Sequence, residues 1–377
     1  MKVCDIVLNS IWFDPRVTKQ LSEYIKFADT VAIGLKCVRY DEKKVNAIPC
    51  KTNIIQRENV QRGGFINTLI SSRKLNKRLA NAIISEKPDI IHANDLTALI
   101  PAYYAAKKLK CRLIYDSHEV FLDNIGLSNS KLHKLYYSYF EKKIVKKCDL
   151  MVSVSNAAAE YFAETYKIRK PLVVTNCIPM DRICEKKPDN GKFEVLNHGM
   201  FYEGRGYSTM AQAAKLLKGK SDICFAIRGF GKLEESLRKY VSDNKLDNFK
   251  FYPPVNVQEL VSEAASSSVG VAITEPINLN FKLSVSNKLF EYAAAGLPVI
   301  MSDIPEHRYL NNKYKFGIII KSNTPQALSD AVLKLYEDNE LYMRCAENAA
   351  KLAREINWET EFKKLLMIER SWFDGKK

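Results

Sequence analysis

The sequence predicts an α/β protein of two Rossmann-like domains, each with a parallel sheet, that face one another across a cleft. The 377-residue length exceeds the size at which a single core usually keeps growing. Short β-branched runs alternate with segments of helical period from end to end, and a polar stretch over residues 181–191 interrupts the alternation near the middle. We therefore expect one domain over residues 1–179 and a second over 180–355. The last segment, 356–377, has helical spacing and is expected to cross back onto the first domain.

The individual elements follow this alternation. The clearest helix covers residues 65–86, because Leu75, Leu79 and Ile83 recur every fourth residue and form one apolar stripe. Right-handed crossovers place the carboxyl ends of parallel strands at one edge, so the loops after the strands are expected to carry the chemistry. The predicted strands cover residues 3–8, 30–35, 89–92, 112–115, 150–154 and 172–175 in the first half, and 193–197, 223–227, 269–273, 299–301 and 317–320 in the second.

The composition restricts the class of protein. The formal net charge is +15, which favours an anionic partner such as acidic lipid headgroups, a phosphorylated small molecule or nucleic acid. The longest apolar run, residues 96–106, is shorter than the roughly 20 residues of a membrane-spanning helix. The first ten residues lack the apolar core of a secretory signal, so we expect a cytoplasmic protein. The nine cysteines show no metal-ligand spacing and are expected to be reduced core residues.

The most informative stretch covers residues 284–299, beyond a candidate strand and into a helix. Ser284 or Ser286 can cap this helix. The helix N-terminus offers unpaired N–H groups to a diphosphate, and Lys288 adds a full positive charge. Glu291 lies three residues further, on the same face, where its carboxylate can accept hydrogen bonds from two ribose hydroxyls. The alternative is an ordinary amphipathic helix with a solvated lysine and glutamate.

Two glycine-containing stretches also lie between a strand and a helix. Residues 199–206 contain three glycines, which allow close backbone approach, and Arg205, which can bind a phosphate through two hydrogen bonds. Residues 228–231 contain two of the three glycines of a dinucleotide fingerprint and lack its context, which argues against a nicotinamide site. A tight strand-to-helix turn around Gly229 explains the second stretch.

Several short motifs, taken together, resemble those of the retaining family 4 glycosyltransferases (glycosyl transferases group 1), which have the GT-B fold. The resemblance covers nearly all of the chain. Agreement of several motifs in order and at these separations is much more specific than any one motif alone. The motifs are DPRV (14–17), HAND (92–95), YDSHE (115–119), SVS (153–155), NCIP (176–179), the glycine loop 199–206, NKLFEY (287–292) and AGLP (295–298).

The resemblance implies that the second domain holds a nucleotide-diphosphate sugar and the first domain the acceptor. Arg205 and Lys288 would bind the diphosphate, Glu291 the ribose, and His118 would reach the transferred sugar as a catalytic residue. Family members retain the anomeric configuration without a metal, and the chain has no clear Asp-x-Asp motif, so no metal or cofactor is expected beside the donor substrate. The other residues assigned in this way are Gly199, Gly229, Ser286, Asn287 and Leu289 on the donor side, and Asp14, Arg16 and Asp95 on the acceptor side.

The chain departs from the family pattern in the donor half. Leu283 stands where the family often has the first of two glutamates. Glu275, in the preceding loop, can replace it as a catalytic residue if that loop folds over the sugar, and is otherwise a surface residue. Met200 replaces a phosphate-binding arginine and Arg205 replaces a lysine, so diphosphate binding is expected to depend more on Arg205 and Lys288.

Three first-domain residues also have structural alternatives. His118 can be a core histidine at the end of a buried strand. Asp14 and Arg16 can pair with each other or cap the following helix, and we favour that structural role over contact with substrate.

Basic residues concentrate on two predicted helices of the first half, and the second cluster follows an aromatic segment, residues 135–140. This pattern suits attachment to an anionic membrane, where a polyprenyl-linked glycan would be the acceptor in surface polysaccharide or glycolipid assembly. A solvated helix face explains the charge equally well. Other interpretations are an epimerase-like enzyme that needs no acceptor, a catalytically inactive sugar-nucleotide sensor, and a nucleic-acid-binding protein, for which we find no motif. The clusters are Arg73, Lys74, Lys77 and Arg78, and Lys142, Lys143, Lys146 and Lys147.

Overall fold

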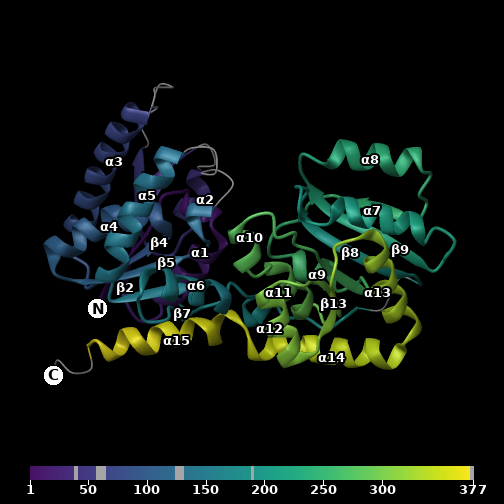
Figure 1. The fold of residues 1–377 in the computed structure, drawn as a ribbon. Helices are drawn as coiled ribbons and strands as arrows, with labels where there is room; N and C mark the ends of the chain where they lie inside the picture. The colour runs from purple at the N-terminus through teal and green to yellow at the C-terminus, as the bar shows by residue number, and fades with distance from the viewer. Residues whose placement is uncertain (38–40, 57–64, 124–130, 188–190, 374–377) are drawn as a thin grey trace. The chain divides into compact units, whose positions relative to one another are not determined.

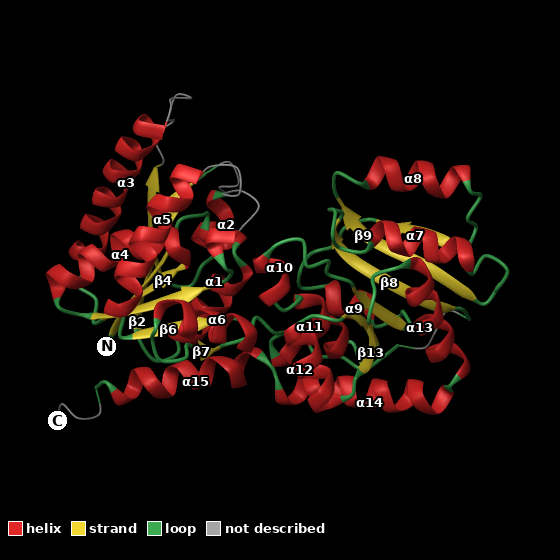
Figure 2. Cartoon of the chain, in the orientation of Figure 1, coloured by secondary structure: helices red, strands yellow, loops and turns green. Residues whose placement is uncertain are grey.

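A computed structural model describes residues 1–37, 41–56, 65–123, 131–187 and 191–373. The chain divides into two units, one formed by residues 1–175 together with 362–377, and the other by residues 176–361. Each unit contains one parallel sheet with helices on both faces (Figures 1 and 2), of seven strands in unit 1 and six in unit 2. The predicted α/β class with two Rossmann-like sheets is therefore confirmed.

Unit 1 has the strand order β3-β2-β1-β4-β5-β6-β7, and all of its strand pairs are parallel. The chain order reverses between β1 and β4, which opens a crevice beyond their carboxyl ends. The elements are β1 (Lys2–Val7), α1 (Pro15–Tyr24), β2 (Asp29–Lys36), α2 (Glu42–Asn46), β3 (Lys51–Gln56), α3 (Phe65–Glu86), β4 (Ile90–Asn94), α4 (Asp95–Leu109), β5 (Arg112–Ser117), α5 (Lys131–Ile144), β6 (Leu150–Ser153), α6 (Asn156–Tyr166), β7 (Leu172–Val173) and most of α15 (Trp358–Ser371).

Unit 2 has the order β10-β9-β8-β11-β12-β13, again with parallel pairs and with a reversal between β8 and β11. Its elements are β8 (Phe193–Met200), α7 (Tyr207–Leu216), β9 (Ile223–Phe230), α8 (Glu234–Asp243), β10 (Phe249–Tyr252), α9 (Leu260–Ala264), β11 (Val269–Ala272), α10 (Leu279–Leu283), α11 (Asn287–Ala294), β12 (Val299–Ser302), α12 (Pro305–Tyr314), β13 (Gly317–Ile320), α13 (Pro325–Glu337) and α14 (Asn339–Glu355).

The central strands are buried on both faces, and this is why they are visible in the sequence as apolar runs. Every residue of β4, β11 and β12 is buried. The sequence analysis missed β3 and β10, which are the edge strands of their sheets. Both carry half-exposed or exposed polar residues, in the segments KTNIIQ and FKFY, so neither forms the continuous apolar run that marks a central strand.

The chain passes from unit 1 to unit 2 earlier in the sequence than the polar stretch over residues 181–191 suggested. The polar stretch after residue 181 was predicted to be the connection, yet its described part packs on unit 2. The N–H of Cys184 donates to the carbonyl of Ala294, and the N–H of Lys187 donates to the carbonyl of Ala265. The division between the units falls between Thr175 and Asn176.

The last helix, α15, belongs mostly to unit 1. It is one continuous helix from Trp358 to Ser371, and the residues from Phe362 onward group with the N-terminal sheet. The ring of Phe362 lies edge-on to Tyr24 of α1, at 5.1 Å between centroids. Within the described residues, no helix combines the length and the apolar character that crossing a lipid bilayer requires.

The packing of α11 on β11 depends on a glycine, and it gives the first prediction. A Cβ added at Gly270 would lie 2.2 Å from Cγ of Tyr292, a ring that is fully buried. We expect Gly270→Ala to lower the free energy of unfolding by about 2 kcal/mol, because the ring has no space into which to move. The control is Gly219→Ala, since an added Cβ there meets nothing within 4 Å. Urea unfolding of both variants measures the effect, and equal midpoints would contradict the packing.

Candidate functional site

Three predicted residues of unit 1 follow three neighbouring strands, and the structure brings them together. Asp14 follows β1, Asp95 begins α4 directly after β4, and His118 follows β5. The N–H of His118 donates to Oδ1 of Asp95 at 3.0 Å. Nδ1 of its ring lies 3.6 Å from Oδ2 of Asp95 and 3.7 Å from Oδ2 of Asp14. The His118 side chain keeps 14% of its surface exposed, so it is not the fully buried core histidine of the structural alternative.

The neighbours of His118 determine which of its ring nitrogens carries a proton. The side-chain amide of Asn94 donates to Oδ1 of Asp5 at 2.6 Å and to the carbonyl of Ile6 at 3.2 Å. Its Oδ1 therefore faces Nε2 of His118, at 3.0 Å, as an acceptor. Nε2 must then carry the hydrogen, and Nδ1 is the nitrogen that faces the two aspartates. Burial raises the pKa of Asp95 above its usual value, although the charge of His118 opposes this.

Arg16 is buried behind this site and does not form part of its surface. Nε and one terminal nitrogen donate to the two carboxylate oxygens of Asp116 at 2.9 and 3.0 Å, and the other terminal nitrogen donates to the carbonyl of Val174. The Arg16 side chain is 3% exposed. Burial alone would raise the pKa of Asp116, but Arg16 and His118 hold it well below its usual range.

The structural alternatives for Asp14 and Arg16 are therefore half correct. Asp14 caps α1, because its side chain accepts from the N–H groups of Arg16 and Val17. Arg16 pairs with Asp116 rather than with Asp14.

In unit 2, two glycines lie side by side at the carboxyl ends of adjacent strands. Gly199 of β8 pairs with Gly229 of β9. Their φ angles are +118° and +140°, in the region that favours glycine. A Cβ on Gly229 would lie 2.0 Å from the carbonyl oxygen of Gly199. Both positions therefore require glycine, and they leave bare backbone at the end of the sheet.

Lys288 lies next to Gly199, and a second cationic side chain, Arg205, is near enough to Lys288 for their charges to interact. Nζ of Lys288 donates to Oδ1 of Asn197 at 2.6 Å and lies 3.4 Å from the hydroxyl of Tyr207. The guanidinium of Arg205 lies over the ring of Phe281, 4.5 Å from its centroid. Asn197 also accounts for the position of the loop, because its amide donates to the carbonyl of Arg205. In the part of the chain that the structure describes, no carboxylate lies within ion-pair distance of either cation.

The electrostatics of Lys288 and Arg205 favour the binding of an anion. Burial, and to a smaller extent the charge of Arg205, lower the pKa of Lys288 to about 7, while Glu291 opposes the change. Burial also lowers the pKa of Arg205. Two half-buried cations that repel one another gain stability when a negative group binds between them. The first turn of α11 adds to this field, because Ser286 precedes it and the structure shows no side-chain cap.

Glu291 is oriented by a histidine that the sequence analysis missed. Nε2 of His198 lies 2.6 Å from Oε2 of Glu291, and the imidazole is 2% exposed. The hydroxyl of Tyr292 accepts from the N–H of His198 and fixes its backbone. The position of His198 in the sequence could have indicated this role, because Asn197 and His198 come directly before the predicted Gly199 in β8.

The remaining predicted donor residues have different surroundings. The loop of Glu275 folds against the glycine loop, because its N–H donates to the carbonyl of Gly204 at 2.9 Å. Asn287 is exposed at the first position of α11. Leu289 is fully buried in the core, and its N–H donates to the carbonyl of Ser286, so its role is packing. Among the described residues, no group of three or more histidine, cysteine, aspartate or glutamate side chains could hold a metal ion.

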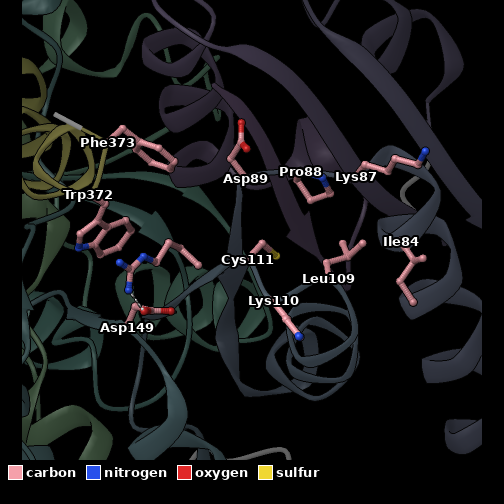
Figure 3. Close-up of a pocket in the computed structure, with 11 residues that line it drawn as sticks. Ile84, Lys87, Pro88, Asp89, Leu109, Lys110, Cys111, Asp149, Trp372 and Phe373 are labelled. Carbon is pink, nitrogen blue, oxygen red and sulfur yellow. Dashed lines mark hydrogen bonds and ion pairs between the residues drawn. The ribbon is translucent and has the colours of Figure 1, made fainter. Parts of the chain in front are cut away.

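A cavity of about 570 Å³ lies at the opposite edge of the first sheet (Figure 3). Its lining residues include Asp89 and Lys110, which precede β4 and β5, and Trp372 after α15. Arg112 pairs there with Asp149. Because the cavity lies at the amino ends of the strands, it is separate from the residues that follow their carboxyl ends.

Comparisons with known proteins agree with this architecture. A family profile described as Glycosyl transferases group 1 matches residues 180–352, and one described as Glycosyltransferase Family 4 matches residues 37–182. An uncharacterised glycosyltransferase of Methanocaldococcus jannaschii is 24% identical over 292 residues, which are 73% of this chain and 72% of that protein. An uncharacterised 42.6 kDa protein in the cps region of Klebsiella pneumoniae is 27% identical over 195 residues, 48% of this chain and 51% of that protein.

Solved structures show the same fold. The sucrose-phosphate synthase of Thermosynechococcus elongatus superposes with a TM-score of 0.78 at 13% identity, over all of both chains. HepE of Anabaena, solved in complex with UDP, superposes with a TM-score of 0.76 at 13% identity, over 98% of this chain and all of that one. The fold and the matched profiles define a GT-B glycosyltransferase. The chain belongs to the group 1 glycosyltransferases, in family 4, as its motifs indicated.

The lowered pKa of Lys288 gives the second prediction. The sequence resemblance implies that Lys288 binds the diphosphate of a nucleotide-sugar, and this role requires its charged form, whereas its pKa is lowered to about 7. The protein must therefore take up a proton on binding above pH 7, and the dissociation constant should rise about thirtyfold between pH 6 and 8.5. Calorimetric titration with UDP-glucose in two buffers of different ionisation enthalpy measures both effects. Lys288→Arg is the control, because arginine stays charged and its profile should be flat. A wild-type profile as flat as that of the control would contradict the buried-lysine site.

Proposed function

We propose that this glycosyltransferase moves a sugar from a nucleoside-diphosphate sugar, bound by unit 2, to a glycan or lipid-linked acceptor, with retention of configuration and without a metal. The observation that carries the proposal is the pair of half-buried cations, Arg205 and Lys288, with no carboxylate partner among the described residues, beside the N-terminus of α11. Such a site has the charge and the backbone donors that a diphosphate needs. Glu291, held by His198, then binds the ribose hydroxyls.

The chemistry follows from the charges. The bond between the anomeric carbon and the phosphate oxygen breaks, and negative charge grows on the diphosphate where Arg205, Lys288 and the helix N-terminus stabilise it. The acceptor hydroxyl attacks from the same face, and its proton passes to the leaving phosphate oxygen. No divalent ion is needed, because the two side chains supply its positive charge. His118 binds a hydroxyl of the transferred sugar through Nδ1, and Glu275 approaches the sugar from its loop.

The acceptor side of the proposal rests on helix α5. Its exposed apolar residues Leu132, Leu135 and Tyr139 recur on one helix face. Exposed lysines surround them, at 131, 134, 142 and 143. A crevice of about 130 Å³ lies between this helix, α3 and α4, at the carboxyl edge of the sheet. These features suit peripheral contact with an anionic bilayer and an acceptor with an apolar part. The crevice residues are Leu8, Leu35, Ser72, Leu75, Asn76, Thr97, Ile100, Tyr136 and Tyr137.

Two of the compared proteins suggest which donor and which pathway to test first. HepE was solved with UDP, which makes a uridine diphosphate sugar the first donor to examine. The Klebsiella relative lies in a cps region, which is consistent with our proposal of surface polysaccharide or glycolipid assembly.

The donor site is tested by thermal shift and calorimetry without metal. We expect one nucleotide family, at a hundred times its dissociation constant, to stabilise the protein by about 2.7 kcal/mol. Lys288→Met and Glu291→Gln should each weaken binding at least about tenfold, because each removes a charge-assisted contact. Lys282→Met, an exposed lysine of the neighbouring α10, should bind as the wild type does. If no nucleoside diphosphate or its sugar conjugate stabilised the protein, the proposal would fail.

Transfer itself is tested by product analysis. Donor alone should be stable, and donor with a polyprenyl-diphosphate glycan should give a product with the anomeric configuration of the donor, in the presence of EDTA. An epimer formed from donor alone would instead identify an epimerase-like enzyme, and donor binding with no reaction would identify a sensor.

Membrane contact is tested by flotation with vesicles that contain phosphatidylglycerol. We expect the protein to float at low salt and to lose this binding in Leu135→Glu/Tyr139→Glu, because each substitution puts charge on the apolar face of α5. The control Lys232→Glu changes charge in unit 2 and should float normally. Equal flotation of the variants, or none by the wild type, would remove the membrane from the proposal.

A further inference from the structure

A buried polar network leads from beneath His118 to the last helix of the chain. Its members are Asp116 of β5, His92 of β4, Tyr24 of α1 and Glu369 of α15, and each is fully buried. All belong to unit 1, although Glu369 is 345 residues from Tyr24 in the sequence. Nothing in the donor and acceptor chemistry above uses His92, Tyr24 or Glu369.

Hydrogen-bond distances connect Glu369 to Asp116, and an ion-pair distance connects Asp116 to His118. The hydroxyl of Tyr24 donates to Oε1 of Glu369 at 2.6 Å. Its oxygen also lies 2.8 Å from Nδ1 of His92. On the other side of the imidazole, Nε2 of His92 lies 3.3 Å from Oδ2 of Asp116, and the same oxygen lies 3.8 Å from Nε2 of His118.

This geometry restricts the hydrogen bonds of His92. When Glu369 is ionised, the Tyr24 proton is directed at Glu369, and the Tyr24 oxygen accepts from Nδ1 of His92. Nε2 of His92 faces Oδ2 of Asp116 and the side-chain nitrogen of Gln20, which itself donates to that oxygen at 2.6 Å. Burial alone would lower the pKa of His92, but its hydrogen bond to Asp116 and the charges of Asp5, Asp116 and Glu369 raise it overall.

Burial of the Glu369 carboxylate lowers the stability of the folded protein. Its Oε2 is buried and has no hydrogen-bond partner among the described groups. Burial raises the pKa of Glu369 to about 7, against the effect of Tyr24 and His92. An apolar side chain at this position would pack the helix without that cost. The group therefore needs a reason other than packing, and its one directed hydrogen bond leads toward the site of His118.

We propose that Glu369 is a positioning residue for His118, because through Tyr24 it fixes His92, and His92, together with Arg16 and Gln20, holds Asp116 in place beside the His118 ring. The inference rests on the proposed function only in that the His118 site contacts sugar. The charged and titratable groups that face this network are Asp5 from β1, Arg16 and Tyr24 from α1, His92 from β4, Asp95 from α4, Asp116 and His118 from β5 and its loop, and Glu369 from α15.

The first test needs no substrate. The chain has five histidines, so the ring nitrogens of ¹⁵N-labelled protein can be assigned one by one with His→Gln variants. We expect Glu369→Gln to lower the pKa of His92, since it removes a negative charge, and to change the ¹⁵N shifts of the His118 ring, which report its hydrogen bonds. Lys363→Gln, on the exposed side of the same helix, should change neither.

A second variant separates positioning from folding. Tyr24→Phe/Glu369→Leu replaces the far end of the network by apolar groups, so the fold should remain stable while the His118 shifts still move. Unchanged His118 shifts in both network variants would overturn the proposal, and so would an unchanged pKa of His92.

The second test uses turnover. With the donor and acceptor found as above, we expect Glu369→Gln to lower kcat by about tenfold and to leave KM for the donor within about twofold, because unit 2 is unaltered. An equal loss in Lys363→Gln, or an unchanged kcat, would overturn the proposal. Failure of the proposed function is distinguishable, because it would remove turnover from the wild type and leave the histidine spectra as predicted.

Discussion

The buried ion pair between Arg16 and Asp116 is the interaction on which the first site depends. A charged pair removed from water is stable only if its hydrogen bonds are nearly complete, and here both carboxylate oxygens are used. The third donor of Arg16 reaches the carbonyl of Val174, beyond β7. The pair therefore ties α1, β5 and the segment after β7 together below the loops that carry Asp14 and His118. Loss of either partner would leave the other as an uncompensated buried charge.

In unit 2 the two cations are not paired with a carboxylate among the described residues, in contrast to Arg16 in unit 1. Arg205 and Lys288 are placed near each other and near a helix N-terminus, and the described residues offer them an amide, a hydroxyl and a ring but no carboxylate. Each contact orients a cation without neutralising it. A pair of cations without a carboxylate partner is less stable than a compensated one, and in the proposed function this difference contributes to the binding of an anion. The two units thus show the same residue types in a structural role and in a proposed ligand-binding role.

Sequence patterns predicted the central strands and the edges of the sheets at which the candidate site residues lie, because buried parallel strands are apolar and the residues after them are not. The sequence allowed the roles of Gly199 and Gly229 and the cap at Asp14 to be predicted, because each depends on the backbone only a few residues away. The partner of Arg16 was not visible, because Asp116 lies 100 residues further along the chain. His198 was missed because it is buried at the end of a strand, where a histidine in the sequence has the same pattern as a core residue.

The order of strands explains why residues so far apart in sequence act together. In unit 1 the chain reverses direction across the sheet between β1 and β4, and β5 follows, so the loops after these three strands are neighbours. Asp14, Asp95 and His118 follow these three strands. In unit 2 the reversal falls between β8 and β11, and the residues around Gly199 and the helix carrying Lys288 lie on its two sides. Helix α15 comes last in the chain, and its buried Glu369 is connected to His92 of β4 through the hydroxyl of Tyr24.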